Sequence, residues 1–353
     1  MLNLDDPKVY TQYDLEGMIS HIHNLPQICR QAWQLAEAFK LPDNYAHINK
    51  VVVLGMGGSA IGGDLVASLT ENEAKIPVLI HRDYNLPAFV DGNTLVIASS
   101  YSGMTEETLS SFRQAIKTKA RKLVITTGGS IKALAEEQDI PVFGFDYKSQ
   151  PRAAMPFSFL SILNFIQKLG FIKDISSDVA EMVTVLEQLS AEINEAVPLN
   201  GNRAKQLTQQ LHGKIVVVYG AGITSDAAHR WKTQLNENSK TYAFYEAFPE
   251  LNHNTIVGYH FPEEMAPSIA VVMLRSSHLL PQTLSRYDIT AQLLNKAGIG
   301  YQIVEGSGKS VLAHIMSLVL LGDYISYYLA ILNRIDPTPV EAIDFLKREM
   351  GMK

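Results

Sequence analysis

The sequence contains a single cysteine, Cys29, among its 353 residues. One cysteine excludes an internal disulfide framework and a metal site built from several thiolates. We therefore expect a reducing compartment, of which the cytoplasm is the simplest. The first ten residues, MLNLDDPKVY, contain no basic segment followed by an apolar one, so we expect no signal peptide.

Positive charge is also scarce. The chain carries 30 Lys and Arg against 36 Asp and Glu, which gives a net charge of −6. Proteins bind nucleic acids through an excess of Lys and Arg that contacts the phosphate backbone, so this balance argues against a nucleic-acid surface. Any anion that binds here is expected to be a small molecule.

Long uninterrupted apolar runs are missing, although 46% of the residues are hydrophobic. The most apolar helical stretch, residues 311–332, is interrupted by His314 and Asp323, so we predict a core helix and no membrane span. No low-complexity segment or long linker separates parts of the chain. A chain of this length is predicted to form two closely packed domains around a large core.

Two stretches share one pattern, in which an apolar run leads into a turn rich in glycine and hydroxyls and then into a helix. Val51–Leu54 opens into GMGGSAIGGD (Gly55–Asp64), and Thr94–Ala98 opens into SYSGMTEET (Ser100–Thr108). Unpaired N–H groups at a helix N-terminus carry partial positive charge, and nearby hydroxyls complete a site for an anion. The predicted ligand is a phosphate, and its predicted contacts are Gly57, Gly58, Ser59, Ser100, Ser102 and Thr105.

The glycine turn has two competing interpretations. Gly55, Gly57 and Ala60 fit the G-x-G-x-x-G/A dinucleotide fingerprint, but no acidic residue for a ribose hydroxyl is clear at residues 81–83, where the second strand ends. A purely structural turn is the other alternative. The four hydroxyl side chains within residues 100–105 exceed what one helix cap requires, and this favours a phosphate ester.

Strands and helices alternate along the rest of the chain. Short Val, Ile and Leu runs between helices indicate a parallel sheet covered on both faces. Predicted strands are Val51–Leu54, Val78–His81, Thr94–Ala98, Lys122–Thr126, Val142–Phe143, Lys214–Tyr219, Thr241–Phe244, Ile269–Leu274 and Gly300–Val304. Predicted helices include Thr105–Lys117, Ile131–Gln138, Ala154–Lys168, Val179–Ala196, Leu280–Lys296, Ser310–Leu332 and Pro339–Met350.

This pattern occurs twice, because the strand Lys214–Tyr219 again opens into a glycine turn, GAGITSD (Gly220–Asp226). The predicted fold class is therefore α/β with two similar halves, each a mainly parallel sheet flanked by helices. We predict one domain over residues 1–152, with an N-terminal helical segment, and a second over residues 153–353. Ligands of such sheets bind beyond the carboxyl ends of the strands, where these turns lie.

Several separated motifs resemble, in order, those of one family. Besides GMGGSAIGGDL and SYSGMTEETL they are HRDYNLP (His81–Pro87), QPRAAMPFS (Gln150–Ser158), QLNENSK (Gln234–Lys240), ELNHNTIVG (Glu250–Gly258) and DPTPVEAIDFLK (Asp336–Lys347). Over nearly the whole chain they resemble the bifunctional phosphoglucose/phosphomannose isomerase family, which is built from sugar isomerase (SIS) subdomains. The resemblance implies reversible conversion of glucose 6-phosphate and mannose 6-phosphate to fructose 6-phosphate, without a metal or organic cofactor.

Aldose–ketose isomerisation opens the sugar ring and moves a proton between neighbouring carbons through a cis-enediol or enediolate. It requires a proton shuttle at the ring oxygen, a carboxylate that moves the carbon-bound proton, and a cation that stabilises the oxyanion. Glu237 is our choice for the carboxylate, because it matches the family's base in the QLNENSK motif. A solvated glutamate at a helix end is the alternative, and Glu250, in another matching segment, is the main rival.

His253, in ELNHN, is our choice for ring opening, because an imidazole titrates near neutrality. Arg152 is predicted to stabilise the enediolate through its permanently charged guanidinium, and a salt-bridged arginine at a domain boundary is the alternative. Lys347 matches the family's tail lysine that approaches the substrate; otherwise it is an exposed surface lysine. Similar enzymes take the histidine that corresponds to His253 from the neighbouring protomer, so the resemblance also implies a homodimer with shared active sites.

Two positions stand out from the family pattern. Met104 occupies a place where many relatives are expected to carry a polar residue, and Thr338 is a candidate for lining the space near C2 of the sugar.

A non-catalytic phosphosugar sensor is the second hypothesis, since it needs the phosphate site but neither Glu237 nor His253. Such a protein typically carries an effector module such as a helix-turn-helix, and none is found. An amino-sugar phosphate enzyme is a third hypothesis, but the chain has no candidate N-terminal glutaminase nucleophile.

Overall fold

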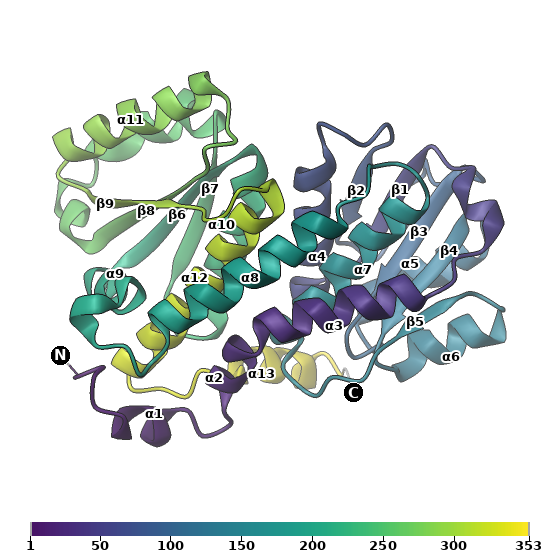
Figure 1. Cartoon of the computed structure of the whole chain (residues 1–353), viewed down its shortest axis with the longest axis horizontal. Helices are drawn as coiled ribbons and strands as arrows, with labels where there is room; N and C mark the ends of the chain where they lie inside the picture. Colours follow the sequence, from purple (N-terminus) through teal and green to yellow (C-terminus); the bar gives the residue numbers. More distant parts are fainter. Residues whose placement is uncertain (1, 352–353) are drawn as a thin grey trace. The chain divides into compact units, whose positions relative to one another are not determined.

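The computed structural model describes residues 2–351, which divide into two compact units (Figure 1). The first-sheet unit comprises Gln27–Ser176 and the segment from Glu341 onward. The second-sheet unit comprises the residues up to Pro26 together with Ser177–Val340. Each unit contains one parallel sheet covered by helices, so the predicted α/β fold class is confirmed.

The first-sheet unit contains a five-stranded sheet of order β2-β1-β3-β4-β5, in which all neighbouring strands are parallel. Its strands are β1 (Lys50–Leu54), β2 (Val78–His81), β3 (Thr94–Ser99), β4 (Arg121–Thr126) and β5 (Val142–Gly144). Its helices are α3 (Leu25–Ala38), η1 (Asp43–Ala46), α4 (Gly57–Thr70), α5 (Glu106–Ile116), α6 (Gly129–Glu137), η2 (Pro151–Ala154), α7 (Met155–Lys168) and α13 (Glu341–Glu349).

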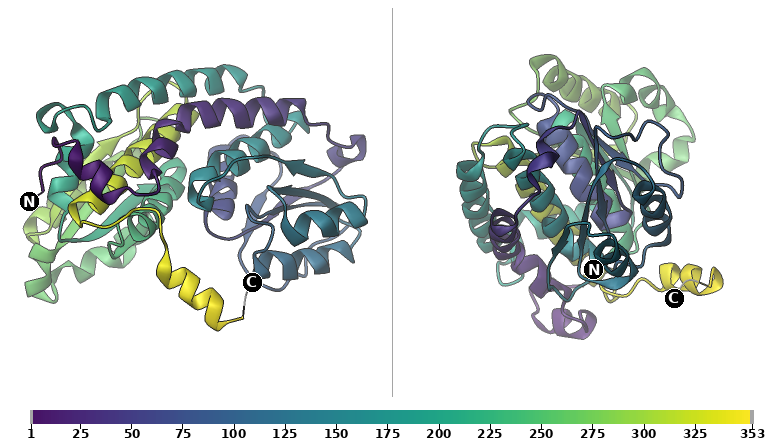
Figure 2. Two further views of the ribbon diagram at one scale, coloured as in Figure 1. Left: turned by 90° about the horizontal axis from the view of Figure 1, so that it is seen from below. Right: turned by 90° about the vertical axis from the view of Figure 1, so that its right-hand side faces the viewer.

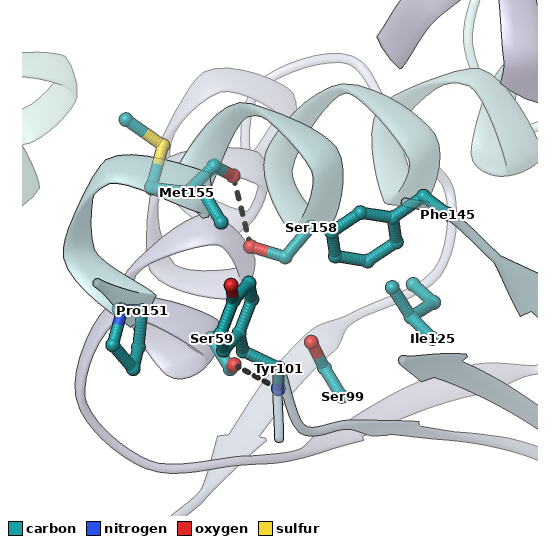
Figure 3. Close-up of a pocket in the computed structure, with 10 residues that line it drawn as sticks. Ser59, Ser99, Tyr101, Ile125, Phe145, Pro151, Met155 and Ser158 are labelled. Atoms are coloured by element: carbon teal, nitrogen blue, oxygen red, sulfur yellow. Dashed lines mark hydrogen bonds between the residues drawn. The ribbon is translucent and has the colours of Figure 1, made fainter. Parts of the chain in front are cut away.

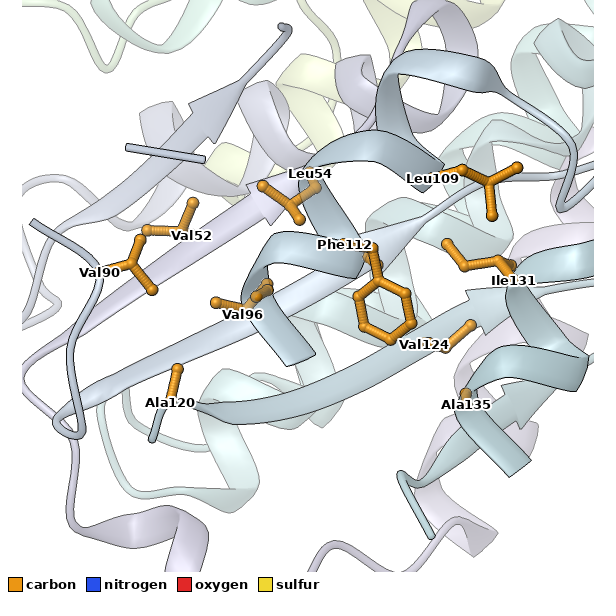
Figure 4. Close-up of a cluster of buried hydrophobic side chains, with 12 residues drawn as sticks. Val52, Leu54, Val90, Val96, Leu109, Phe112, Ala120, Val124, Ile131 and Ala135 are labelled. Atoms are coloured by element: carbon orange, nitrogen blue, oxygen red, sulfur yellow. The ribbon is translucent and has the colours of Figure 1, made fainter. Parts of the chain in front are cut away.

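Both faces of this sheet are buried, which explains the nearly continuous apolar runs of its central strands. Helices α5 and α6 contact strands β3 and β4, and α4 contacts β1 and β2. One buried cluster joins side chains of β1, β3 and β4 to Phe112 of α5 and Ile131 of α6 (Figure 4). Alternating residues of β1 and β3 enter this cluster, for example Val52 and Leu54, as expected for one face of a strand.

The second-sheet unit contains a four-stranded parallel sheet of order β7-β6-β8-β9. Its strands are β6 (Ile215–Ala221), β7 (Ala243–Phe248), β8 (Ile269–Arg275) and β9 (Gly300–Glu305). Its α-helices are α1 (Lys8–Tyr13), α2 (Met18–His23), α8 (Ser176–Ile193), α9 (Arg203–Leu211), α10 (Ser225–Glu237), α11 (Pro281–Lys296) and α12 (Val311–Leu332). Short 3₁₀ segments are η3 (Leu199–Gly201), η4 (Gly222–Thr224), η5 (Glu250–His253), η6 (Thr255–His260) and η7 (Glu263–Ser268).

Helix α12 is the central helix of the second-sheet unit. Among the described residues it is the one helix long and apolar enough to cross a membrane by length and composition, and its apolar window is completely buried inside the protein. It contacts α2, α9 and α10 of the same unit. This burial is typical of the core helix that the sequence predicts.

The two compact units differ from the predicted division at residues 152 and 153. Helix α7 follows that boundary, yet it packs against α4 of the first-sheet unit. A Cβ on Gly62 of α4 would overlap Ser158 of α7, so only glycine permits this approach. The N-terminal segment instead belongs to the second-sheet unit, where α1 and α2 contact α12.

One strand begins later and extends further than predicted. Strand β7 covers Ala243–Phe248, whereas the sequence predicts Thr241–Phe244. It lies at the edge of its sheet and exposes Phe244 and Tyr245, so its pattern lacks the apolar run of a central strand. The 3₁₀ segments within residues 250–268 were not predicted, because they are too short to show a helical period.

Candidate active site

The first-sheet unit reverses its strand order between β1 and β3. Strand β2 lies beyond β1 on one side, and β4 and β5 lie beyond β3 on the other. Parallel pairing places Leu54 beside Ala98, so the loops that follow β1 and β3 begin side by side at the carboxyl edge of the sheet. We call these loops, Gly55–Ser59 and Ser100–Thr105, the cradle. Such a reversal is the usual ligand position in open α/β sheets.

The glycines that start α4 have different roles. Gly57 has a positive φ of 49°, and a Cβ there would meet nothing within 4 Å, so its side faces open space. A Cβ on Gly58 would lie 2.9 Å from the Pro151 carbonyl oxygen and 3.1 Å from Arg152 Cα. The absence of a side chain at Gly58 therefore brings η2 against the cradle, a role that the sequence analysis did not predict.

The cradle hydroxyls are arranged around the starts of α4 and α5. Ser100 Oγ lies 3.0 Å from Thr105 Oγ1, and Ser102 Oγ accepts a hydrogen bond of 3.2 Å from the Met104 N–H. No side chain makes a cap hydrogen bond to either helix, since neither Met56 nor Thr105 does so at the N-cap position. At the start of α4 the Ser59 N–H donates to the Met56 carbonyl at 3.1 Å, so the N–H groups of Gly57 and Gly58 are those that this helix can offer to an anion.

The SYSG turn rests on a second glycine turn that the sequence analysis missed. Gly103 has a φ of 66°, and a Cβ there would overlap the carbonyl oxygen of Gly128. The thioether of Met104 accepts hydrogen bonds from Ser130 N (3.3 Å) and Ser130 Oγ (3.2 Å). The pair of glycines that follows β4, in TTGGS, is the sequence signal for this support.

A narrow recess lies behind the cradle, between it, Phe145 and the start of α7 (Figure 3). Ser59, Tyr101, Pro151 and Ser158 are among the residues that line it. Its volume of about 10 Å³ corresponds to roughly one water molecule. A sugar phosphate does not fit in this volume. The exposed residues of the cradle include Gly57 and Ser102.

A much larger cavity, of about 500 Å³, lies in the second-sheet unit. It is lined mainly by apolar side chains of β6, β7 and residues 255–269. Within it, the hydroxyls of Tyr219 and Tyr259 lie 3.0 Å apart, and burial raises the pKa of both. Neither Glu237 nor His253 lines this cavity, so size alone does not identify the site predicted from the sequence.

Arg152 lies in η2 of the first-sheet unit and is 2% exposed. Its backbone packs directly on Gly58 of the cradle, so the structure brings this predicted cation together with the predicted phosphate loops. A surface arginine would not be buried to this degree. Lys347 lies on α13, the yellow helix in Figure 2, whose residues are all exposed.

An ion pair in the first-sheet unit was not predicted. Arg82, in the HRDYNLP motif, forms an ion pair with Asp64 of α4, and Asp64 is 9% exposed. Burial raises the pKa of the Asp64 carboxyl, and the Arg82 guanidinium opposes this change. Both residues lie within motifs that the sequence analysis quoted, but a lone charged residue in a motif does not show its partner.

Glu237 is the last residue of α10 in the second-sheet unit and is partly buried. The residues that follow fix the helix end: Asn238 donates to Ser326 Oγ at 2.9 Å, and Ser239 Oγ donates to the Leu235 carbonyl at 2.6 Å. Ser326 belongs to α12, so the carboxylate is carried by a helix terminus that is anchored to the core helix of its unit.

His253 ends the short segment η5 and is exposed. The segment itself is well anchored, because Leu251 is completely buried and Asn252 donates to Thr290 Oγ1 at 3.0 Å. Glu250, the rival base, is exposed and accepts a hydrogen bond of 2.8 Å from Asn254. The predicted residues thus lie in both units: the cradle, Arg152 and Lys347 in the first, and Glu237 and His253 in the second.

The equivalent glycine turn of the second-sheet unit buries one of its two hydroxyl side chains. Thr224 is completely buried and donates to the Leu274 carbonyl at 2.8 Å. The Ala221 N–H in turn donates to Thr224 Oγ1 at 2.9 Å. This hydroxyl is therefore used within the protein, whereas Ser225, at the start of α10, is only partly buried.

Known proteins of one family resemble this chain over nearly its whole length. A family model described as the bacterial phospho-glucose isomerase C-terminal SIS domain matches residues 200–350. The bifunctional phosphoglucose/phosphomannose isomerase of Caldicellulosiruptor bescii is 42% identical over 335 residues, which cover 95% of this chain and 99% of the relative. The protein of the same name from Aquifex aeolicus is 34% identical and covers 85% of this chain and 90% of its own.

A solved structure of a hypothetical protein from Thermus thermophilus has a TM-score of 0.69 at 16% identity and covers 98% of this chain and 93% of its own. That similarity supports the fold alone. The identity to the Caldicellulosiruptor bescii relative extends over nearly the full length of both proteins. This chain therefore belongs to the bifunctional phosphoglucose/phosphomannose isomerase family.

Proposed function

We propose that this protein interconverts glucose 6-phosphate and mannose 6-phosphate with fructose 6-phosphate. The observation that carries the proposal is the 42% identity, over nearly the full length of both chains, to a relative named for both activities. The cradle is consistent with it, because two uncapped helix N-termini and a group of hydroxyls meet where the strand order reverses. A phosphate ester is the ligand that this chemistry suits.

The cradle would hold the phosphate through N–H groups of α4 and α5 and through its hydroxyls, and it would thereby fix the sugar chain. His253 would move the proton at the ring oxygen, and Glu237 would move the proton between C1 and C2. Arg152 would stabilise the enediolate oxygen, since a buried guanidinium in a water-poor site interacts strongly with developing negative charge. Lys347 would approach the substrate from the C-terminal helix.

A homodimer is part of this proposal. His253 is exposed at the end of an anchored segment, so it is available to a second copy of the chain. In a dimer each active site would then take its ring-opening histidine from the partner. The reducing conditions of the cytoplasm suit a protein whose single cysteine, Cys29, is buried and forms no disulfide.

The test is a coupled assay that measures formation of fructose 6-phosphate from glucose 6-phosphate and, separately, from mannose 6-phosphate. A chelator is present and no metal is added. The Glu237→Gln variant keeps the size of the side chain and removes the carboxylate, so we expect its kcat to fall by at least about 100-fold. Glu250→Gln is the matched control and should stay within about twofold of the wild type. If Glu250→Gln loses activity instead, the base is assigned to the wrong glutamate.

The same assay separates the isomerase from a phosphosugar sensor. A sensor binds glucose 6-phosphate, measured by calorimetry, but forms no product from either sugar. Turnover of both sugars supports the bifunctional enzyme, and turnover of glucose 6-phosphate alone would narrow the specificity. Binding without turnover of either sugar would overturn the proposed function.

A further inference from the structure

We propose that Tyr101 is a positioning residue that holds Arg152 in register with the phosphate cradle. This inference rests on the proposed function, because it assumes that Arg152 acts on the enediolate. Tyr101 lies inside the SYSG turn, but the role assigned to this residue does not involve contact with the substrate. It acts through the segment that carries Arg152.

The backbone of Tyr101 is fixed within the cradle. Its N–H donates a hydrogen bond of 3.2 Å to Ser59 Oγ at the start of α4, which Figure 3 shows. Its carbonyl accepts hydrogen bonds from the Thr127 N–H at 3.1 Å and from Thr127 Oγ1 at 2.7 Å. The tyrosine therefore connects both cradle loops with the loop that follows β4.

The phenol of Tyr101 contacts a different segment. Its hydroxyl donates to the Tyr147 carbonyl at 2.7 Å and accepts from the Ser149 N–H at 3.0 Å. Both partners are backbone groups of the chain that leads into η2, three to five residues before Arg152. Both hydrogen-bonding roles of the hydroxyl are thus used to fix this segment.

The other side of η2 is fixed by Gly58. The Gly58 backbone is so close to Pro151 and Arg152 that even a methyl group would have to displace them. The recess between these groups holds about one water molecule, which leaves η2 little room to move. Because Arg152 is buried, a shift of its backbone also moves its guanidinium relative to the cradle.

A positioning role makes a specific prediction for Tyr101→Phe. Phenylalanine keeps the ring, which lies 6.3 Å from that of Phe145, and removes the hydroxyl alone. The cradle hydroxyls and helix N-termini remain, so KM should stay within about twofold. We expect kcat to fall about tenfold, because misplacement of a charged group by a fraction of an ångström weakens transition-state stabilisation.

The deciding experiment is a double-mutant cycle that combines Tyr101→Phe with Arg152→Ala. Arg152→Lys is the second background, for use if the alanine variant does not fold. If Tyr101 acts through Arg152, Tyr101→Phe should cost less than about twofold once Arg152 has been replaced. Additive losses would overturn the inference. Tyr45→Phe is the matched control: it removes a buried phenol that donates to the Lys122 carbonyl at the opposite, amino end of the strands, and should leave kcat unchanged.

Ligand binding provides a second readout that a general loss of stability does not reproduce. Sorbitol 6-phosphate carries the phosphate but no group that mimics the enediolate at C1 and C2. An open-chain hydroxamate with the same phosphate carries both. Tyr101→Phe should bind the first normally and the second about tenfold more weakly, and equal loss for both would contradict a positioning role. A wild type that turns over neither sugar overturns the proposed function and this inference with it; an active wild type with an additive cycle overturns the inference alone.

Discussion

Single glycines set the geometry of the cradle. Gly103 combines a left-handed backbone with a position where a methyl group would overlap the Gly128 carbonyl, so any side chain there forces the two turns apart. We expect Gly103→Ala to lower the free energy of unfolding by about 3 kcal/mol, the sum of backbone strain and steric overlap. Urea denaturation followed by circular dichroism measures this change.

Gly92→Ala is the matched control, because its nearest contact would be an ordinary 3.6 Å and its φ is not left-handed. That variant should be neutral or more stable by up to about 1 kcal/mol, through the lower entropy of the unfolded chain. Equal losses in the two variants would show that the contact between the two glycine turns is not the cause.

At the scale of elements, α12 depends on a carboxylate from α8. Glu181 accepts hydrogen bonds from the N–H groups of Lys309 and Ser310, and the Ser310 side chain accepts from the Ala313 N–H. The core helix of the second-sheet unit therefore begins in a closed cap. Burial raises the pKa of the Glu181 carboxyl, but hydrogen bonds from Ser310 and Lys309 outweigh it and lower the pKa below its ordinary value.

This shift gives Glu181 a pH signature. Because its pKa is lower in the folded state, its charge contributes stability above the unfolded pKa, and that contribution is lost as the pH falls through the folded pKa. We expect Glu181→Gln to cost about 0.5 to 1 kcal/mol at neutral pH and less at a pH below the ordinary pKa of a glutamate. Thermal melting at both pH values tests this. Glu192→Gln, at an exposed position on the same helix, should show no such difference.

Local patterns predicted most elements, and long-range contacts explain what they missed. The cradle could be located from sequence because a strand, a glycine turn and a helix start are adjacent along the chain, as at Val51–Thr70. The two compact units were not predictable in this way. Which segments belong to each unit depends on long-range contacts. Examples are the contact of Gly62 with Ser158 and the contacts of the N-terminal segment, whose partners lie about 200 residues away in the sequence. No periodicity shows such pairings.

At the scale of the whole molecule, Lys205 joins the N-terminal segment to the rest of the second-sheet unit. Its completely buried ammonium donates to the Leu4 carbonyl (2.8 Å), Asp5 Oδ1 (3.0 Å) and the Glu195 carbonyl (2.9 Å). Lys205→Met fills similar space but removes the ammonium from all three acceptors, of which the Leu4 carbonyl keeps a hydrogen bond from the Tyr10 hydroxyl and Asp5 Oδ1 keeps one from the Leu199 N–H. We expect it to lower the free energy of unfolding by about 3 kcal/mol, as when one partner of a buried ion pair is removed.

The chain supplies its own probes for where this loss falls. Its two tryptophans are both buried, Trp33 in the first-sheet unit and Trp231 in the second. Urea unfolding followed by fluorescence in Trp33→Phe and Trp231→Phe backgrounds therefore reports each unit separately. Because Lys205 and its acceptors all lie in the second-sheet unit, Lys205→Met should lower the midpoint reported by Trp231 more than that reported by Trp33. Equal shifts of both midpoints would instead mean that the two units unfold as one cooperative structure, in which an interaction within one unit stabilises both.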